Sequence, residues 1–135
     1  MNPVLEGGCA CGAMRYRGEQ EPSHETYCHC TICRKVSGAP VVAWITLPSA
    51  CFRFVRGKPA RFDSSEVAFR EFCPQCGTQL TFHDKRDPGR VDVTTASLDD
   101  PDAFPPRDHI WTRSRISWFE IADALARFET SRDEG

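Results

Sequence analysis

Hydrophobic and polar residues alternate over short stretches of this chain, and turn-forming residues separate the stretches. The clearest case is residues 51–56, where Phe52 and Phe54 fall on one face of an extended segment, a pattern typical of a half-buried strand. The following Gly57-Lys58-Pro59 predicts a turn. Further strands are predicted at residues 13–17, 26–28, 41–46, 60–63, 68–72, 79–83 and 90–95. Many short strands separated by turns indicate a mainly β fold with little helix.

Helical patterns are scarce. A single helical turn is predicted at residues 31–36, and another helix is expected after Asp100, where Pro101 suits a first helical position. Residues 121–128 include helix-forming residues, and the sequence does not decide between a helix and irregular structure there. The chain shows no internal repeat or linker, so we expect one domain over residues 1–135, with a core at about residues 3–128 and a polar tail at residues 129–135.

Composition and charge narrow the class of protein. The 135 residues are 40% hydrophobic and 27% charged, as in an ordinary globular domain. A formal net charge of -2 gives no overall attraction to phosphate backbones, so nucleic acid is not expected as a partner. No apolar run reaches the roughly 18–20 residues of a membrane span, and the first residues show no signal-peptide pattern. We therefore expect a cytoplasmic protein without a membrane partner.

Eight cysteines are the strongest chemical signal in the sequence. Without a signal peptide they indicate metal ligands, and disulfides are the alternative. Cysteines two apart in an extended segment point to the same side, and a C-x-x-C turn followed by glycine brings its two sulfurs together, so both spacings favour zinc. Seven of the eight fall in such spacings: Cys9-x-Cys11-Gly12, Cys28-x-Cys30-x-x-Cys33 and Cys73-x-x-Cys76-Gly77.

The seven clustered sulfurs divide into four and three. Residues 28, 30 and 33 can reach one ion by themselves, and we call them the cysteine triplet (Cys28, Cys30, Cys33). The others form the cysteine quartet (Cys9, Cys11, Cys73, Cys76). In an alternative division, the C-x-x-C pair at residues 30–33 shares one ion with the pair at residues 73–76. The gap between these two pairs is longer than the about 15–20 residues that usually separate the C-x-x-C pairs of a zinc site. Four thiolates close a structural zinc site, whereas three protein ligands leave one position for water or substrate. We therefore predict two zinc ions.

Four motifs occur in order over roughly residues 5–120, and their combination is specific. They are Gly7-Gly8-Cys9-x-Cys11-Gly12, Tyr27-Cys28-His29-Cys30-x-x-Cys33-Arg34-Lys35-x-Ser37-Gly38-Ala39-Pro40, Phe72-Cys73-x-x-Cys76-Gly77-Thr78-x-Leu80 and His109-Ile110-Trp111. Together they resemble the glutathione-dependent formaldehyde-activating enzyme family, also called the centromere protein V/GFA domain family. The resemblance implies a zinc-stabilised β-tent fold, with a structural zinc at the quartet and a second zinc at the triplet, which is the glutathione site.

The resemblance also implies a carbon–sulfur lyase activity. Such an enzyme joins glutathione reversibly to formaldehyde or a related small aldehyde, giving an S-hydroxymethyl-type adduct, so the expected partners are a small-molecule thiol and an aldehyde. In this interpretation the triplet is catalytic and glutathione is the co-substrate. A non-catalytic zinc module for protein interaction or thiol binding is the second hypothesis, because no unambiguous general base accompanies the triplet.

Residues beside the clusters carry weaker predictions. Arg34 and Lys35 follow Cys33, and we predict that they offset its charge or hold a glutathione carboxylate; ordinary solvated residues on a short helix are the alternative. His29 lies between two ligands in an extended segment, so its side chain is expected to point away from the metal. Large aromatic residues are expected in the core: Trp44, Phe72, Phe82, Trp111 and Trp118.

Overall fold

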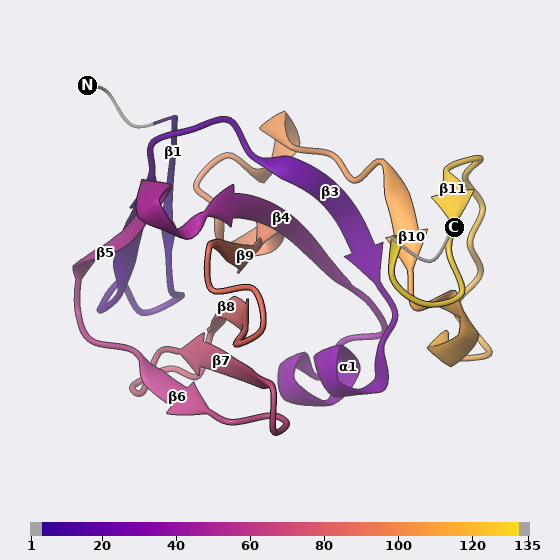
Figure 1. The fold of residues 1–135 in the computed structure, drawn as a ribbon, viewed down its shortest axis with the longest axis horizontal. Coiled ribbons are helices and arrows are strands. Elements are labelled where there is room, and N and C mark those ends of the chain that lie inside the picture. Colours follow the sequence, from indigo (N-terminus) through magenta and orange to yellow (C-terminus); the bar gives the residue numbers. More distant parts are fainter. Residues whose placement is uncertain (1–3, 133–135) are drawn as a thin grey trace.

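A computed structural model describes residues 4–132, which form two β-sheets and, in this part of the chain, a single α-helix (Figure 1). The smaller sheet has the order β1-β2-β5 and contains β1 (Leu5–Gly8), β2 (Arg15–Gly18) and β5 (Phe52–Arg56). The larger sheet has the order β11-β10-β3-β4-β9-β8-β7-β6. Its strands are β3 (Ser23–Cys28), β4 (Val42–Pro48), β6 (Ala60–Phe62), β7 (Ala68–Phe72), β8 (Gln79–Asp84), β9 (Arg90–Thr94), β10 (Asp108–Ile110) and β11 (Ala126–Arg127). The prediction of a mainly β fold is confirmed.

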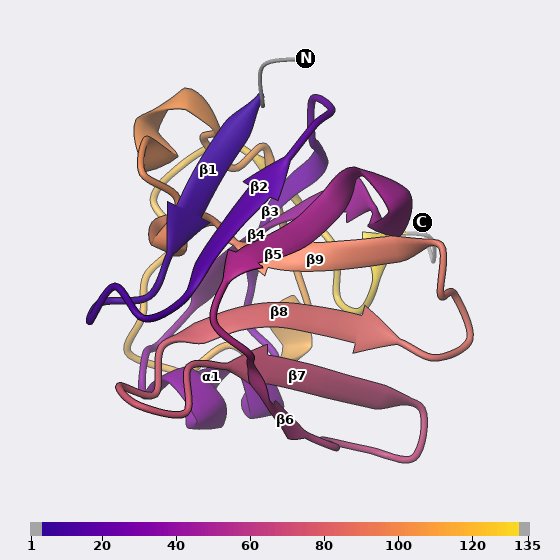
Figure 2. The same cartoon turned by 90° about the vertical axis from the view of Figure 1, so that its left-hand side faces the viewer.

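Antiparallel pairing dominates the larger sheet, whereas β10 runs parallel to both β3 and β11. Figure 2 shows β9, β8 and β7 side by side, with the β1–β2 hairpin above them. The register places Cys28 opposite Val42 at one end of β4 and Thr46 opposite Asp92 near the other end. Residues far apart in sequence therefore line one face of this sheet.

The main core contains buried side chains from both sheets. Tyr16 of the smaller sheet packs in one cluster with Ile45, Leu80 and Val93 of the larger sheet, and all four are inaccessible to solvent. Burying such a side chain contributes about 1.5–3 kcal/mol relative to leaving it exposed. The Tyr16 hydroxyl reaches the Ser97 hydroxyl at 2.6 Å, so its polar end is also satisfied inside the core.

Strand β1 was not predicted, because Leu5-Glu6-Gly7-Gly8 lacks alternation and glycine weakens a strand signal. Close packing explains the glycine at position 7. A Cβ atom on Gly7 would lie 2.4 Å from the Tyr16 hydroxyl oxygen. The requirement for glycine thus comes from the neighbouring strand, which no local pattern reveals.

Helix α1 (Thr31–Ser37) confirms the helix predicted at residues 31–36. It begins at Cys30, whose sulfur accepts a hydrogen bond from the Cys33 backbone N–H at 3.2 Å, and it ends at Gly38 in the left-handed conformation. Four 3-10 turns complete the helical structure: Ser49–Cys51, Thr95–Ser97, Pro101–Ala103 and Thr112–Ser114. In the described residues, none of these helices has the length and apolarity that crossing a bilayer requires.

The C-terminal region differs from the expected tail. Residues 121–128 contain no helix; they form irregular structure and β11, and the Phe128 N–H donates to the His109 carbonyl at 2.8 Å. Arg132 then forms a bidentate pair with Asp108 at 2.7 and 2.9 Å. Residues 129–132 were predicted as part of a polar tail, but these non-local bonds hold them against β10. Residues 133–135 of the predicted tail lie outside the described residues.

Candidate metal centres and cavity

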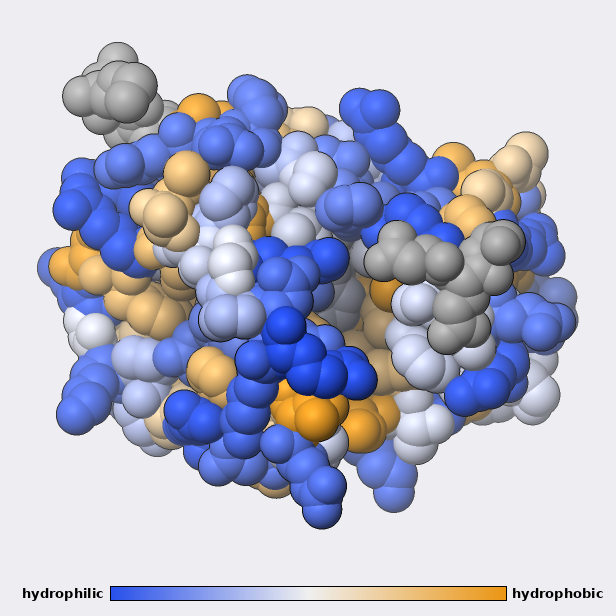
Figure 3. All heavy atoms as spheres, viewed as in Figure 1, coloured by the Kyte–Doolittle hydropathy of each residue, from blue (hydrophilic) through white to orange (hydrophobic). Residues whose placement is uncertain are grey.

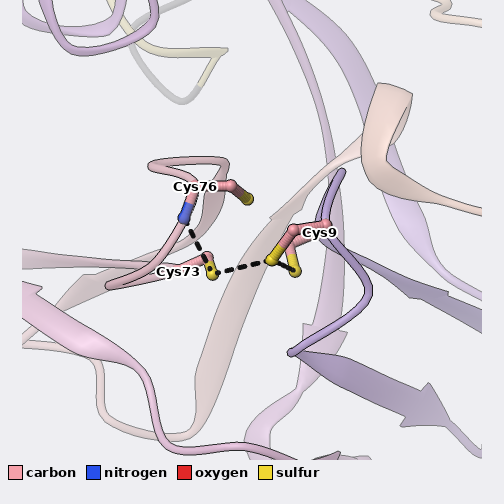
Figure 4. Close-up of side chains that lie close together, drawn as sticks. Cys9, Cys73 and Cys76 are labelled. Carbon is pink, nitrogen blue, oxygen red and sulfur yellow. Dashed lines mark hydrogen bonds between the residues drawn. The ribbon is translucent and has the colours of Figure 1, made fainter.

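The cysteine quartet joins two distant turns. Cys9 and Cys11 lie in the loop between β1 and β2, whereas Cys73 and Cys76 lie in the turn between β7 and β8. Figure 4 shows Cys73 and Cys76 reaching from their turn towards Cys9. The four sulfur atoms lie within 4.8 Å of one another. Cys11 Sγ is 3.6 Å from Cys9 Sγ and 3.8 Å from Cys73 Sγ.

Local backbone geometry prepares these sulfurs as metal ligands. Gly77 adopts a φ of 82° and donates its N–H to the Cys73 carbonyl at 2.9 Å, which closes the C-x-x-C turn. Amide groups point at the sulfurs: the Met14 N–H lies 3.1 Å from Cys9 Sγ, and the Cys76 N–H lies 3.4 Å from Cys73 Sγ. The Thr78 hydroxyl and backbone lower the pKa of the Cys76 thiol to about 5. These contacts favour the thiolate form that a metal requires.

Two sulfur separations in the quartet match those of a tetrahedral zinc site, and all of them lie within 4.8 Å. With Zn–S bonds of about 2.3 Å, tetrahedral geometry places neighbouring sulfurs about 3.8 Å apart. The observed separations of 3.6 and 3.8 Å agree with this value. The donor set is thiol only, which suits a closed structural centre for a soft metal ion.

The cysteine triplet is built from the end of one strand and the start of the helix. Cys28 is the last residue of β3, Cys30 caps α1, and Cys33 lies in its first turn. The three sulfurs lie within 4.8 Å of one another, with 3.5 Å between those of Cys28 and Cys33. This cluster also fits one thiolate-bound metal ion, but it provides only three ligands. The structure thus brings together the two sets of cysteines that the spacing predicted.

The three triplet sulfurs shift one another's pKa values in opposite directions. Contacts with Cys28 and then Cys33 lower the pKa of the Cys30 thiol to about 2. Contact with Cys30 in turn raises the pKa of Cys28. Cys30 is therefore the triplet thiol whose ionisation its neighbours favour most, and its sulfur also accepts the Cys33 backbone N–H at 3.2 Å. A metal ion that binds thiolates here would displace the thiol protons.

Arg70 is the buried cation beside the triplet. Its Nη1 and Nη2 atoms each lie 3.5 Å from Cys33 Sγ, and the residue is 3% exposed. Its guanidinium carbon also lies 5.0 Å from the Phe82 ring centroid. Because a guanidinium stays protonated and a buried charge needs a counter-charge, Arg70 favours negative charge on the triplet. Our sequence reasoning missed Arg70, although alternation in β7 places it on the same face as the buried Ala68.

A chain of hydrogen bonds holds His29 on the side away from the sulfurs. His29 Nε2 lies 2.9 Å from His109 Nδ1, and His109 Nε2 lies 3.0 Å from a carboxylate oxygen of Asp123. Burial, and then the charge of His109, lowers the pKa of His29 to about 4, so this ring is neutral. The carboxylate accepts from His109 Nε2–H; in the neutral tautomer of His109, Nδ1 then accepts from His29 Nε2–H. As expected from the sequence, His29 is not part of the metal cluster.

A cavity of about 420 Å³ opens beside the triplet, and all three triplet cysteines line it. Trp44, Phe82 and Trp111 form an apolar part of its wall. In the view of Figure 3, the surface is hollowed near its middle. Hydrophilic side chains surround the hollow, and hydrophobic side chains lie below it, over α1. The triplet therefore differs from a purely structural centre, because a small molecule can reach it.

Other predicted residues lie elsewhere. In the part of the chain that the structure describes, neither Arg34 nor Lys35 lines the cavity. Arg34 Nη2 lies 3.4 Å from the Thr31 hydroxyl and Lys35 is exposed, so their contact with glutathione stays a prediction. Trp44 is buried as predicted, but Trp118 is 67% exposed, because it lies in the irregular segment before β11. The prediction that Trp118 belongs to the core was wrong.

The fold and the site define a small, mainly β protein with two candidate cysteine metal centres, one with four sulfurs and one with three beside a cavity. A model of the family described as "Glutathione-dependent formaldehyde-activating enzyme" matches residues 4–114, and the chain belongs to this family. The match covers both clusters, Arg70 and His109. It ends before Asp123, so the hydrogen bond from this carboxylate to His109 comes from outside the matched region.

Individual relatives agree with this membership. The chain is 32% identical over 127 residues to a Halomonas elongata protein named for glutathione-dependent formaldehyde activation, covering 87% of this chain and 81% of that protein. It is 37% identical over 82 residues to a Schizosaccharomyces pombe protein named as an uncharacterized lyase, covering 59% of this chain and 58% of the other. A crystal structure of a Rhodobacter sphaeroides protein shares the fold, with a TM-score of 0.58 at 21% identity over 92% of this chain and 99% of that one.

Loss of a quartet ligand should unfold the protein. A structural zinc contributes about 10–16 kcal/mol in small domains, which is as large as the whole stability of about 5–15 kcal/mol. We expect Cys76→Ser to lose about one zinc per chain and its cooperative thermal transition, measured by metal analysis and circular dichroism. Cys51→Ser is the matched control, because Cys51 lies outside both clusters. A Cys76→Ser protein that keeps its metal and melts like the parent would contradict this assignment.

Loss of Arg70 should weaken metal binding at the triplet only. Hydrogen bonds to a charged group contribute about 1.5–3 kcal/mol, so Arg70→Met should lose its more labile zinc to a chelator at roughly 10- to 100-fold lower chelator concentration. Arg61→Met is the control, because Arg61 lies over the Phe69 ring, outside the cavity lining. Equal chelator titrations for parent and Arg70→Met would show that the guanidinium does not support the triplet.

Proposed function

We propose that this protein is a zinc-dependent carbon–sulfur lyase that reversibly joins glutathione to formaldehyde or a related small aldehyde. The observation that carries this proposal is the difference between the two clusters. Four sulfurs cluster at the quartet and would complete a tetrahedral centre, whereas the triplet has three sulfurs and lines a cavity. The names of the family and of its relatives, which include a lyase, support the same reaction class.

Cys28, Cys30 and Cys33 would hold the reactive-site zinc, and a zinc ion so held supplies an open position that lowers the pKa of a thiol and polarises an oxygen. The protein supplies the surroundings of that position. Arg70 offsets the negative charge of the cysteine thiolates, and its buried guanidinium remains available as a hydrogen-bond donor, because its Nε has no partner among the described residues.

The apolar wall controls access of water. Trp44 and Phe82 pack at the triplet, with ring centroids 6.3 Å apart, and both line the cavity. A wall of this kind keeps water away from the reacting sulfur and strengthens the electrostatic effect of Arg70. The hydrogen-bonded chain from Asp123 to His29 fixes the peptide that connects Cys28 and Cys30, so two of the three sulfurs stay in place when substrate enters.

The reaction balances without a redox partner. The thiol of glutathione gives up its proton, its sulfur adds to the carbonyl carbon of the aldehyde, and a C–S bond forms as the C=O π bond opens. A proton then ends on the former carbonyl oxygen, giving the S-hydroxymethyl adduct. Reversal of the same steps releases the aldehyde. Arg70 is the buried donor at the triplet that can stabilise the negative oxygen during the addition.

An exchange experiment tests this function. With ¹³C-formaldehyde and glutathione at equilibrium, magnetisation-transfer NMR measures how fast the aldehyde carbon moves between free and adduct forms. The zinc-loaded protein should accelerate this exchange, Cys51→Ser should match the parent, and Cys30→Ser, which lacks one triplet sulfur, should lose most of the acceleration. Exchange no faster than in buffer, with zinc bound at both clusters, would favour a non-catalytic zinc module instead.

A further inference from the structure

The cavity beside the triplet has a second end with a different chemistry. His24, Thr46, Arg90 and Asp92 line it, and they come from β3, β4 and β9. Thr46 lies four positions along β4 from Val42, which is paired with Cys28. At about 3.3 Å per residue, this end lies roughly 13 Å along the sheet from the triplet. The cavity therefore joins a sulfur site to a polar site.

A strained bulge directs His24 into this polar end. The register of β3 against β4 shifts between Ser23 and Thr26, and His24 has a φ of 55° in the left-handed region. Bulges re-aim side chains, and strained residues other than glycine concentrate at functional sites. Arg132 Nη1 lies 2.8 Å from His24 Nδ1. Because arginine can only donate, His24 Nδ1 accepts, and its Nε2–H is a donor for a ligand.

The charged residues at this end are not all satisfied by one another. Asp108 pairs with Arg132 through two hydrogen bonds of 2.7 and 2.9 Å. In contrast, Arg90 Nη2 lies 3.5 Å from Asp92 Oδ1, and no hydrogen bond reaches Asp92 Oδ2 from another described residue. The Thr46 hydroxyl donates to Asp92 Oδ1 at 2.7 Å and so orients the carboxylate. Burial raises the pKa of Asp92, which shows that its charge is not fully compensated.

We propose that this polar end binds a zwitterionic α-amino acid head group. Asp92 Oδ2 accepts from the α-ammonium, and Arg90 with the Nε2–H of His24 donates to the α-carboxylate. This inference rests on the proposed function, in which the thiol sulfur occupies the triplet. One carboxylate oxygen without a hydrogen bond, beside one cation and one neutral donor, complements a zwitterion and not a simple anion.

The distance between the triplet and the polar end of the cavity determines which thiols can contact both. In a γ-glutamyl thiol, seven bonds join the sulfur to the α-carbon of the glutamyl group, a span of about 9 Å in an extended chain. The remaining roughly 4 Å of the separation is within reach of the side chains at the two ends. A thiol that lacks the γ-glutamyl group cannot contact both ends. His24, Arg90 and Asp92 are therefore specificity-determining residues that favour γ-glutamyl thiols.

Ligand comparison on the unmodified protein gives the first test. Calorimetry on the zinc-loaded protein compares glutathione with N-acetylglutathione, which lacks the ammonium, and with cysteinylglycine, which lacks the glutamyl group. Glutathione should bind about 10- to 100-fold more tightly than either, the range of one hydrogen bond to a charged group. Equal affinities would overturn this inference and leave the proposed function standing. Absence of binding by every thiol would overturn both.

The Asp92→Asn variant tests whether Asp92 causes the preference for glutathione over cysteinylglycine. Asp92→Asn should lower the affinity for glutathione to that for cysteinylglycine, while the affinity for cysteinylglycine stays as in the parent and shows that the fold and the triplet are intact. Asp87→Asn is the matched control, because Asp87 lies 3.9 Å from Arg90 but does not line the cavity. A preference for glutathione that survives in Asp92→Asn, or that disappears equally in Asp87→Asn, would contradict the assignment.

Discussion

The contact between the four sulfurs of the quartet is the constraint on which the rest of the structure depends. It connects the β1–β2 loop of the smaller sheet to the β7–β8 turn of the larger one. The main core lies between these sheets, and Cys73 is itself one of its buried residues. A small domain has limited apolar area to bury, so a metal bound by the quartet would stabilise a sheet arrangement that the core alone would hold weakly. The same arrangement brings Arg70 of β7 against Cys33.

The triplet also consists of cysteine thiols, but its position at the end of β3 and the start of α1 leaves it with three sulfurs beside a cavity. Its sulfurs come from a strand end and one helical turn, so local geometry brings them together without a distant fourth cysteine. Arg70 of β7 and His109 of β10 come from other strands: Arg70 places a buried cation against Cys33, and His109 holds His29 on the side away from the sulfurs. The result is a charged, accessible centre at one end of a cavity. In the proposed function, the polar residues at the other end of the cavity would contact the part of the thiol ligand that lies away from its sulfur.

The sequence predicted what depends on short-range geometry. The cysteine spacings, the short strands and helix α1 follow from the periodicity of the backbone, so the triplet could be proposed from the residues between its members. The quartet followed only as the remaining two cysteine pairs, with another pairing left open, because its members lie far apart in sequence. The sequence did not predict features that depend on pairing between distant strands. Arg70 faces Cys33 only because β7 folds back over α1, and the bulge at His24 forms only against β4. Trp118 and residues 121–128 were misjudged or left open because their composition resembles core or helix, whereas hydrogen bonds to β10 decide their structure.

The central claim is that the triplet is an open metal site completed by a thiol from solution. X-ray absorption at the zinc edge measures the mean number of sulfur ligands per zinc. For one closed and one open site the account predicts about 3.5 sulfurs per zinc in the free protein and about 4 after saturation with glutathione. A mean of about 4 before glutathione is added, or a mean that does not change on saturation, would contradict it.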